Sequence, residues 1–255
     1  MKTVILAGGY GTRLSEETVV KPKPMTEIGA RPILWHILKI YEAAGFKDFI
    51  IACGYRGDVI KEYFASFVLR NNDLIVDLGL GEVASLGSRS PDWRVACIDT
   101  GLETQTGGRL LLLQDHLESE TFMVTYGDGV ADLNIQRLLE FHKGHGRLAT
   151  VTAVRPPPRF GSLELDGDSV SVFNEKLPTH AGWINGGFFV FEPQVLDYIG
   201  GTEVKLEAEP LATLAADRQL AAFRHDGFWK PVDTLREKQE LESMWESGDA
   251  PWKIW

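Results

Sequence analysis

The hydrophobic positions of this 255-residue chain fall into two alternating patterns, from its first residues almost to its last. Three short runs are apolar without interruption, which is typical of strands that are buried on both faces of a sheet. These runs are residues 3–7 (TVILA), 49–53 (FIIAC) and 122–126 (FMVTY). Three further runs alternate more between apolar and polar positions and predict additional strands at residues 149–154, 170–173 and 188–191.

Between these runs, apolar residues recur at the spacing of a helix. The spacing predicts helices at residues 32–44, 58–69, 135–142 and 234–245. Pro32 in the opening turn of the first helix and Gly45 just beyond its end are typical helix boundaries. Thr234 and Glu237 have the spacing of a capping box. Strands that alternate with crossover helices indicate an α/β fold, a Rossmann-like domain with a mixed, mostly parallel sheet covered by helices on both faces.

Residues 71–93 interrupt this alternation. They contain glycine and serine, show only weak periodicity and end in the turn-like sequence RSPDW. Three interpretations are open: a lid over the site, an excursion toward a neighbouring subunit, or a plain surface loop. No repeat, low-complexity run or linker divides the chain, so we predict a single domain over residues 1–255.

The charge of the chain bears on its partners. The sequence has 26 Lys and Arg against 36 Asp and Glu, a formal net charge of −10. A duplex-binding protein needs a basic face, so nucleic acid is not an expected partner, whereas a few local cations suffice to hold a nucleotide. No signal-peptide pattern or membrane-spanning run is present, and membrane association is not expected. Cys53 and Cys97 lie in apolar runs and are predicted to be small core residues, so we expect a cytoplasmic protein.

The first predicted strand leads directly into the glycine-rich sequence GGYGTR. Glycines after a buried strand let backbone N–H groups approach a phosphate closely, and ligands of open parallel sheets lie beyond the carboxyl ends of strands. The third glycine of a dinucleotide-binding fingerprint is missing, which disfavours an oxidoreductase. A Walker loop is also excluded, because Gly11 is followed by Thr12 and Arg13. The candidate phosphate-binding cations are Arg13 and Lys23, and the prolines on both sides of Lys23 predict an extended segment there.

Two aspartates are candidate metal ligands. Asp128 lies between two glycines at the end of the predicted strand 122–126, on the same side of the sheet as the glycine loop. Asp233 directly precedes the last predicted helix, which Thr234 can cap without it. An aspartate between glycines is also typical of a simple turn, and one before a helix can favour the positive helix end. Magnesium binds few protein carboxylates and completes its shell with water and phosphate oxygens, so this pair is sufficient.

The sequence LAGGYGTRL, followed shortly by PKPM, resembles the signature of the nucleotidyltransferases that build nucleoside-diphosphate sugars from sugar 1-phosphates. The resemblance implies a Mg²⁺-dependent enzyme in which the glycine loop wraps the nucleotide and Arg13 and Lys23 neutralise its phosphates. It implies that Asp128 and Asp233 clamp the metal, and that Arg13, Lys23 and Asp128 are catalytic. The implied nucleotide contacts are Leu6, Ala7, Gly8, Gly9, Gly11, Thr12, Arg13, Lys23, Thr106, Gly107 and Gly108.

Three further segments resemble the sugar-phosphate side of the same site: TGGR (106–109), NEK (174–176) and NGGFFVF (185–191). The resemblance implies that Glu175 accepts from sugar hydroxyls and that Lys176 pairs with the sugar phosphate. The full set of implied contacts is Arg109, Tyr126, Gly127, Glu175, Lys176, Asn185, Gly186 and Gly187. On local grounds alone, a Glu-Lys pair is typical of a solvated surface and a double glycine of a simple bend.

Within this family, the chain resembles members that transfer the cytidylyl group of CTP to glucose 1-phosphate, giving CDP-glucose and pyrophosphate. The runs that carry this closer resemblance are TYGDGVADL, INGGFFVF and GFWKPVDTLREK, and residues 71–94 match least. The same chemistry with dTTP or UTP, or with another sugar 1-phosphate, and a non-catalytic nucleotide-sugar-binding protein remain open. The resemblance also implies a homo-oligomer. Lys230 stands where a neutral polar residue is expected, and two roles are open for it: tuning the metal or contacting a phosphate.

Overall fold

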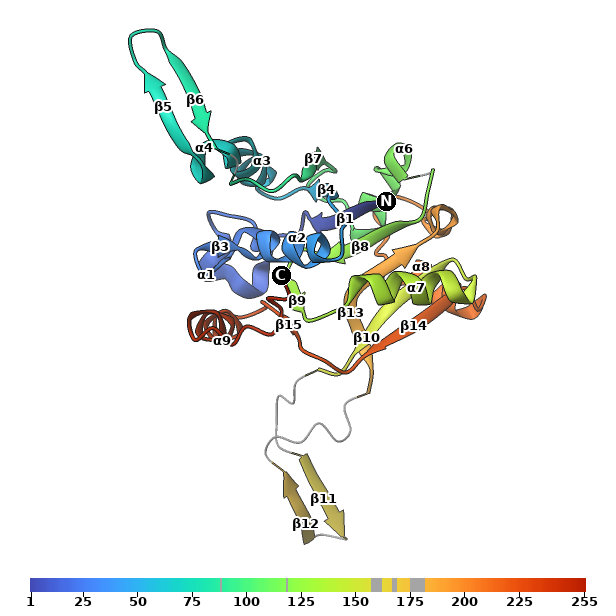
Figure 1. Cartoon of the computed structure of the whole chain (residues 1–255). Helices are drawn as coiled ribbons and strands as arrows, with labels where there is room; N and C mark the ends of the chain where they lie inside the picture. The colour runs from blue at the N-terminus through green and yellow to red at the C-terminus, as the bar shows by residue number, and fades with distance from the viewer. Residues whose placement is uncertain (88, 118, 157–161, 167–168, 175–181) are drawn as a thin grey trace.

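A seven-stranded sheet forms the centre of the molecule (Figure 1). The computed structural model describes residues 1–255 except 88, 118, 157–161, 167–168 and 175–181. In spatial order the strands are β14 (Leu220–His225), β10 (Ala149–Val154), β13 (Ile184–Phe191), β8 (Phe122–Tyr126), β1 (Lys2–Ala7), β4 (Asp48–Cys53) and β7 (Arg94–Asp99). The predicted α/β architecture is confirmed.

The sheet is mixed and mostly parallel, as predicted. β1 pairs in parallel with β4 on one side and with β8 on the other, and β4–β7 and β10–β14 are also parallel pairs. Only β13 runs antiparallel to its two neighbours in the sheet, β8 and β10. The carboxyl ends of β1, β4 and β8 therefore meet at one edge, which is where ligands of such sheets bind.

Alternate side chains of the central strands face two separate hydrophobic cores. Ile5 and Phe49 lie in one core, and Val4 and Ile50 lie in the other. Because both faces are covered, these strands carry uninterrupted apolar sequence. The helices that contribute to the first core are α2 (Ile33–Ala43), α3 (Gly57–Ala65), α7 (Ile135–His145) and α9 (Leu235–Glu246), and those of the second are α5 (Thr106–Leu111), α6 (Gln114–Leu117) and α8 (Glu209–Ala216).

The predicted helices form with two differences in their bounds. Residues 58–69 form two helices, α3 (Gly57–Ala65) and α4 (Phe67–Asn71), separated at Ser66. The Ser66 hydroxyl donates to the carbonyl of Glu62 at 2.7 Å, a local bond that competes with continuation of the helix. Helix α7 extends past its predicted end to His145, where Gly146 in the left-handed conformation terminates it.

The strand pattern also differs from the prediction at its margins. The edge strands β7 and β14 were not predicted: each holds an apolar run of four residues, but most of their side chains are only partly buried or exposed. The strand predicted at 170–173 is β12, which pairs with β11 in a separate two-stranded sheet. The remaining short elements are η1 (Thr12–Leu14), α1 (Ser15–Thr18), η2 (Lys23–Met25), β2 (Glu27–Ile28), β3 (Arg31–Pro32), β9 (Gly129–Ala131), β11 (Ser162–Asp166), β12 (Ser169–Asn174), η3 (Pro193–Tyr198) and β15 (Trp229–Pro231).

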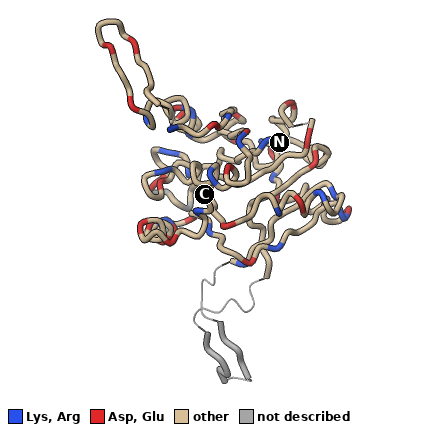
Figure 2. Tube along the Cα trace, in the orientation of Figure 1, with Lys and Arg blue, Asp and Glu red and all other residues tan. Residues whose placement is uncertain are grey.

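Charged residues of both signs are interspersed over the body of the molecule (Figure 2). Within the described part of the chain, no helix has the length and apolar character needed to cross a membrane.

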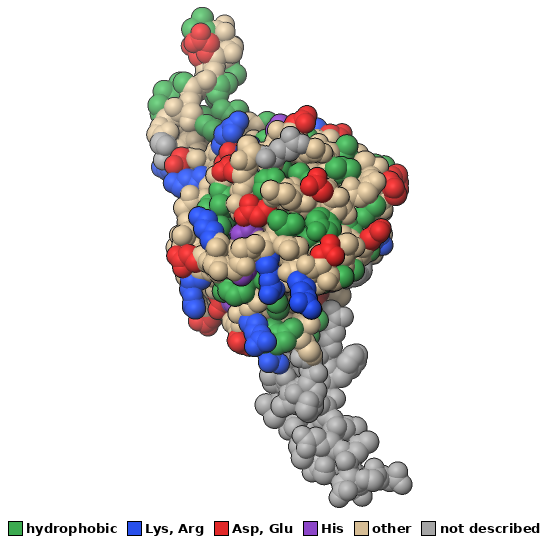
Figure 3. Space-filling view, turned by 90° about the vertical axis from the view of Figure 1, so that its right-hand side faces the viewer, with side chains coloured by type: hydrophobic (Ala, Val, Ile, Leu, Met, Phe, Trp, Pro, Cys, Tyr) green, Lys and Arg blue, Asp and Glu red, His purple; other side chains and the backbone are tan. Residues whose placement is uncertain are grey.

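An exposed β-hairpin projects from the body (Figures 1 and 3). Its strands are β5 (Asp73–Asp77) and β6 (Glu82–Leu86), and every side chain on both is exposed. Two leucines in the turn, Leu78 and Leu80, are 90% and 74% exposed. This hairpin lies within residues 71–93, for which a lid, an excursion toward a neighbouring subunit and a plain surface loop were the open interpretations.

The C-terminal segment docks on the body through aromatic side chains, as its tryptophan content indicates. Trp245, Trp252 and Trp255 surround His36 of α2, and Trp252 is fully buried. The indole Nε1 of Trp252 donates to His36 Nδ1 at 3.3 Å, and His36 Nε2 lies 2.8 Å from the carbonyl of Ile28. These two contacts satisfy a neutral imidazole that is protonated on Nε2.

Candidate active site

The glycine loop begins where β1 ends, at the carboxyl edge of the sheet. The carbonyl of Gly8 accepts from the backbone N–H of Tyr55 at 3.1 Å and from Arg109 Nη2 at 3.0 Å. A Cβ on residue 8 would lie 2.1 Å from Cζ of Arg109, so this close approach requires glycine. The loop is therefore fixed at Gly8 by a buried guanidinium, and its glycines line a cavity.

Arg109 has a different environment from the one implied by the family resemblance. Its side chain is buried, and Nη1 donates to the carbonyls of Cys53 (3.1 Å) and Gly101 (2.8 Å) and to the Thr100 hydroxyl (2.7 Å). Burial lowers the pKa of the guanidinium from its usual value, but not enough to remove its charge near neutral pH. Arg109 thus holds the glycine loop, and its pairing with a sugar phosphate stays a prediction.

The glycines next to Arg109 lie inside helix α5 and face the chain behind it. The backbone N–H groups of Gly107 and Gly108 donate to the carbonyl of Val204 at 3.0 and 3.2 Å. Neither glycine is among the described residues that line the cavity, although Thr106 is. The contact of Gly107 and Gly108 with a nucleotide stays a prediction of the family resemblance.

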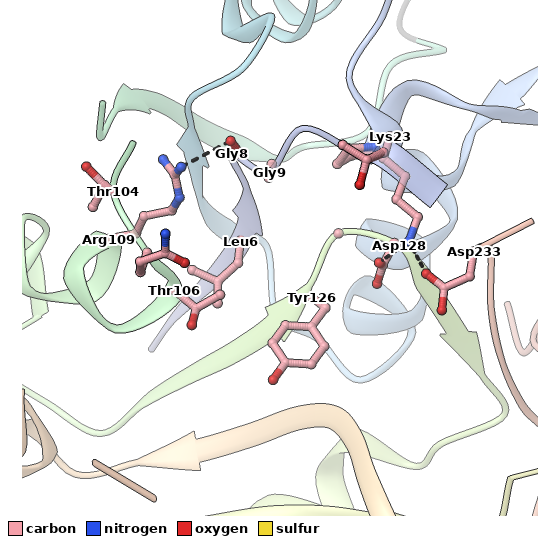
Figure 4. A pocket seen from close by; sticks show the side chains of 16 residues that line it. Leu6, Gly8, Gly9, Lys23, Thr104, Thr106, Arg109, Tyr126, Asp128 and Asp233 are labelled. Atoms are coloured by element: carbon pink, nitrogen blue, oxygen red, sulfur yellow. Dashed lines mark hydrogen bonds and ion pairs between the residues drawn. The ribbon is translucent and has the colours of Figure 1, made fainter. Parts of the chain in front are cut away.

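Lys23, Asp128 and Asp233 converge at one end of the cavity (Figure 4). The Lys23 ammonium donates to Asp128 Oδ2 at 2.5 Å and to Asp233 Oδ1 at 2.6 Å. Burial opposes the charge on Lys23, but the attraction of the two carboxylates outweighs it, so the pKa of the ammonium is raised above its usual value. Lys23 is consequently a cation at every physiological pH.

The backbone around Lys23 differs from the extended segment that the prolines predict. Pro22 is extended, with φ −70° and ψ 153°, but Lys23–Met25 forms a short 3-10 turn, η2. The N–H of Thr26 donates to the Lys23 carbonyl at 3.0 Å and closes this turn. The turn buries the backbone of Lys23 and directs its side chain to the two aspartates.

A small antiparallel ladder brings the two aspartates together from distant parts of the chain. In this ladder, β9 pairs with β15 so that Gly129 lies opposite Pro231. The N–H of Val232 donates to the Asp128 carbonyl at 2.8 Å, and that of Gly127 to the Leu6 carbonyl at 3.1 Å. Asp128 is thereby tied both to the strand before Asp233 and to the strand before the glycine loop.

These two carboxylates fit a magnesium ion. Within the described residues, no group of three or more His, Cys, Asp or Glu side chains is arranged to hold a metal. Mg²⁺ does not need one, because it is commonly bound by one or two carboxylates with water and substrate phosphates in the other positions. Lys230 takes no part in this arrangement. Its ammonium contacts Glu240 of α9, which corrects the expectation that it tunes the metal or contacts a phosphate.

Tyr126 also lines the cavity (Figure 4), and its hydroxyl belongs to a polar network. Its hydroxyl donates to Glu207 Oε1 and accepts from Asn185 Nδ2 at 3.0 Å, while the Thr106 hydroxyl donates to Glu207 Oε2 at 2.6 Å. Gly187, with φ +77°, leaves room for the ring, since a Cβ there would lie 2.4 Å from Cδ2 of Tyr126. Gly187 thus accommodates the ring of Tyr126, and the contact of Gly186 and Gly187 with a sugar stays a prediction.

The cavity has a volume of about 330 Å³ and collects most of the sequence-predicted residues. The predicted residues that line it are Leu6, Ala7, Gly8, Gly9, Gly11, Thr12, Lys23, Thr106, Arg109, Tyr126, Gly127, Asp128 and Asp233. Glu175 and Lys176 lie outside the described residues, as does the side chain of Arg13. Asn185 joins the site through Tyr126, whereas Gly186 accepts from Trp229 Nε1 at 2.7 Å.

Sequence reasoning missed four residues of this region. Pro24, Thr104 and Gln105 line the cavity, and Glu207 connects Thr106 to Tyr126. Pro24 and the TQTGG run were visible as neighbours of predicted residues. Glu207 has no local signal, because it lies in a connection without a motif, and only its tertiary contacts reveal it.

Comparisons with known proteins identify the family and its relatives. The family model described as nucleotidyl transferase matches residues 2–236. The chain is 53% identical over 256 residues to the glucose-1-phosphate cytidylyltransferase of Salmonella typhi, with 100% of both chains covered. It is 30% identical over 244 residues to the mannose-1-phosphate guanyltransferase of Candida albicans, covering 91% of this chain and 61% of that protein. A UDP-glucose pyrophosphorylase structure from Acinetobacter baumanii has a TM-score of 0.70 at 15% identity, covers 99% of this chain and 95% of that one, and shows the shared fold.

Proposed function

Because the chain belongs to the nucleotidyl transferase family, we propose that it transfers the cytidylyl group of CTP to glucose 1-phosphate, giving CDP-glucose and pyrophosphate. The observation that carries this proposal is the convergence of Lys23, Asp128 and Asp233 in a cavity bordered by the glycine loop. The choice of base and sugar rests on the full-length identity of 53% to the Salmonella typhi protein, since the 30% identical relative is named a mannose-1-phosphate guanyltransferase.

Different residues of the cavity are proposed to bind the two anionic substrates, the nucleotide and the sugar phosphate. Backbone N–H groups of Gly8–Gly11 are proposed to bind the nucleotide phosphates, and Arg109, which lines the same cavity, fixes the loop through the Gly8 carbonyl. Lys23 supplies a positive charge to the triphosphate, and Arg13 is proposed to supply another. Asp128 and Asp233 would hold Mg²⁺, which when bound neutralises phosphate charge and orients the phosphates for attack.

The transfer needs no covalent enzyme intermediate. An oxygen of the sugar phosphate attacks the α-phosphorus of the nucleotide, and the bond from that phosphorus to the β-phosphate oxygen breaks as pyrophosphate leaves. The chain contributes by placing the two anions in line and by cancelling their repulsion. Lys23 lies beside Asp128 at one end of the cavity, where its positive charge is proposed to offset the negative charge of the phosphates.

The sugar side of the cavity is proposed to lie near Tyr126. The hydroxyl of Tyr126 is oriented by Asn185 and Glu207, so its position is fixed before any ligand enters. Burial raises the pKa of this phenol well above its usual range, so the group remains a neutral hydrogen-bonding hydroxyl. Glu175 and Lys176 remain proposed contacts of the sugar hydroxyls and the sugar phosphate.

Release of pyrophosphate tests the proposal. The purified chain is incubated with Mg²⁺, glucose 1-phosphate and, in separate reactions, CTP, UTP, dTTP, GTP or ATP. CTP is expected to give the highest kcat/KM, and mannose 1-phosphate in place of glucose 1-phosphate is expected to lower it. A preference for dTTP or UTP would retain the reaction class and overturn the base assignment. Tight binding of nucleotide without pyrophosphate release would favour a non-catalytic nucleotide-sugar-binding protein.

The proposal includes a homo-oligomer that is assembled through the β5–β6 hairpin. Leucine side chains as exposed as Leu78 and Leu80 are costly to leave in water, and contiguous exposed apolar surface commonly marks an interaction site. The hairpin projects away from the body of its own chain, so a second copy is a better partner for it than its own site (Figure 3).

A further inference from the structure

The ammonium group of Lys23 occupies the place between the two carboxylates that are proposed to hold the metal. It lies 2.5 Å from Asp128 Oδ2 and 2.6 Å from Asp233 Oδ1. We infer that Lys23 is a resident counter-ion of the nucleotide-free chain, which the divalent metal displaces as the nucleotide arrives. This inference deepens the proposed function, because it assigns an order of binding to the metal and nucleotide at the same site.

Geometry makes the two cations exclusive. A Mg²⁺ ion ligated by these same two oxygens would lie about 2.0–2.1 Å from each of them. The Lys23 nitrogen is almost equally close to both oxygens, so a metal and the ammonium would occupy overlapping volumes. The metal therefore enters this position only after the ammonium leaves it.

Electrostatics explains why the lysine stays until a nucleotide is present. The carboxylates of Asp128 and Asp233 lie inside the cavity wall, with side chains 30% and 17% exposed, where uncompensated negative charge is unfavourable. Lys23 compensates part of that charge in the empty site. A triphosphate offers the ammonium a second set of anionic oxygens, and the metal that accompanies it offers the carboxylates a stronger cation.

The local structure confines this exchange to one side chain. The Lys23 backbone is closed into the η2 turn and is buried, with its carbonyl bonded to Thr26 at 3.0 Å. The backbone of Lys23 is fixed, so only its four-carbon side chain can change conformation. The cavity that receives it is also lined by Gly8 and Gly9 of the glycine loop, where the phosphates are proposed to bind.

A nearby lysine provides a matched control. Lys21 precedes the same proline-rich turn, but its ammonium pairs with Glu17 at 3.1 Å and it is not among the described residues that line the cavity. Neutralising Lys21 changes the charge of the chain by the same amount as neutralising Lys23. Any effect of total charge on metal binding is therefore shared by both variants, whereas direct competition is confined to Lys23.

The test is metal binding to the intact chain without nucleotide. Mn²⁺ is titrated into wild type, Lys23→Met, Lys23→Gln and Lys21→Met, and free Mn²⁺ is measured by electron paramagnetic resonance. Both Lys23 variants are expected to bind Mn²⁺ about tenfold more tightly than wild type, and Lys21→Met is expected to match wild type. Adding Asp233→Asn to Lys23→Met is expected to abolish the gain. Unchanged Mn²⁺ affinity in the Lys23 variants, or a gain that survives Asp233→Asn, would overturn the inference.

A second measurement needs no variant and stands even if both Lys23 variants fail to fold. Crystals of nucleotide-free wild type soaked in Mn²⁺ are expected to show Lys23 between the aspartates and no anomalous density there. Anomalous density bridging Asp128 and Asp233 would overturn the inference. Neither measurement depends on turnover, so a failed cytidylyl assay with the expected Mn²⁺ result would reject only the proposed substrates.

Discussion

At the scale of single residues, the two carboxylates at the end of the cavity differ in how they are held. Asp128 is carried by a turn whose backbone is bonded to Val232, next to Asp233, and through Gly127 to Leu6 of β1. Its position is therefore set by the sheet itself, and the side chain can change without moving the backbone. This makes Asp128 a suitable position for a nearly isosteric substitution.

We predict that Asp128→Asn lowers kcat by about 100-fold or more while the fold is retained. The amide keeps the shape of the carboxylate but removes the negative charge proposed to hold Mg²⁺. Pyrophosphate release at saturating Mg²⁺ and CTP measures kcat, and thermal unfolding checks the fold. Asp115→Asn on the exposed surface of α6 is the control and should leave kcat unchanged. Near-normal turnover of Asp128→Asn would exclude Asp128 as a metal ligand.

A second prediction separates the two roles considered for Arg109. Arg109→Met leaves the carbonyls of Gly8, Cys53 and Gly101 without their buried donor, so the free energy of unfolding should fall by about 2–4 kcal/mol. The KM for CTP should rise, because the glycine loop loses its support. Urea unfolding and steady-state kinetics measure these changes.

The exposed Arg137→Met on α7 is the control for Arg109→Met and should be neutral within about 0.5 kcal/mol. Unaltered stability with a raised KM for glucose 1-phosphate alone would instead restore the sugar-phosphate role of Arg109.

Single residues could be assigned to the cavity from the sequence where they stand in a distinctive local pattern. Lys23 and Asp128 were identifiable because each stands in a distinctive local pattern, and both line the cavity. Arg109 was correctly placed in the region, but its partners are backbone carbonyls from distant segments, which no local pattern reveals. Glu207 was invisible for the same reason, since both of its donors, Thr106 and Tyr126, are far from it in sequence.

At the scale of elements, the β5–β6 hairpin is held by its own contacts. Asp77 Oδ1 accepts from the N–H groups of Gly79 and Leu80 at 2.9 Å each, and Arg89 pairs with Asp73 at 3.0 Å at the base. The hairpin can thus keep its shape while its leucines contact another molecule.

We predict that Leu78→Asp shifts the chain from oligomer to monomer in sedimentation velocity, because a charge in an apolar contact is unfavourable. Leu112→Asp is the control, since Leu112 is also exposed but lies at the end of α5, away from the hairpin. It should leave the sedimentation coefficient unchanged. A wild-type chain that is monomeric at micromolar concentration would contradict the proposed oligomer.

Whether a helix or strand could be predicted from the sequence depended on the local pattern that its burial or capping leaves there. The capping box of Thr234 and Glu237 forms at the start of α9 as predicted, because it is encoded by two residues three apart. The two strands of the hairpin were not predicted. Both of their faces are exposed, so their sequences lack the alternation of apolar and polar residues that marks a half-buried strand. The antiparallel direction of β13 was equally hidden, because its buried half is apolar like that of a parallel strand.

At the scale of the whole molecule, the docked C-terminal segment couples stability to pH through His36. Burial lowers the pKa of His36 to about 4, from a usual value of 6.5. Protonation would place an N–H on Nδ1, which already accepts from Trp252. The folded state therefore binds this proton more weakly than the unfolded state does.

We predict that the free energy of unfolding falls by roughly 3 kcal/mol as pH decreases from 6.5 to 4. The contribution is fully present above the unfolded pKa and is lost as pH falls toward the folded pKa. Urea unfolding followed by tryptophan fluorescence reports this loss directly, because three tryptophans surround the ring. His36→Gln should flatten the slope in this pH window. A slope equal to that of wild type would assign the pH dependence to other groups.

The ladder that joins Asp128 to Asp233 also has a consequence for how the protein is made. Lys23 and Asp233 are separated by 210 residues, and Lys23 and Asp128 by 105. Because a chain leaves the ribosome from its amino terminus, the glycine loop and Lys23 emerge early and the second carboxylate emerges late. A nascent chain can therefore present a phosphate-binding loop long before it can carry out transfer. Translation itself thus delays activity until Asp233 and the helix behind it have been synthesised and have docked.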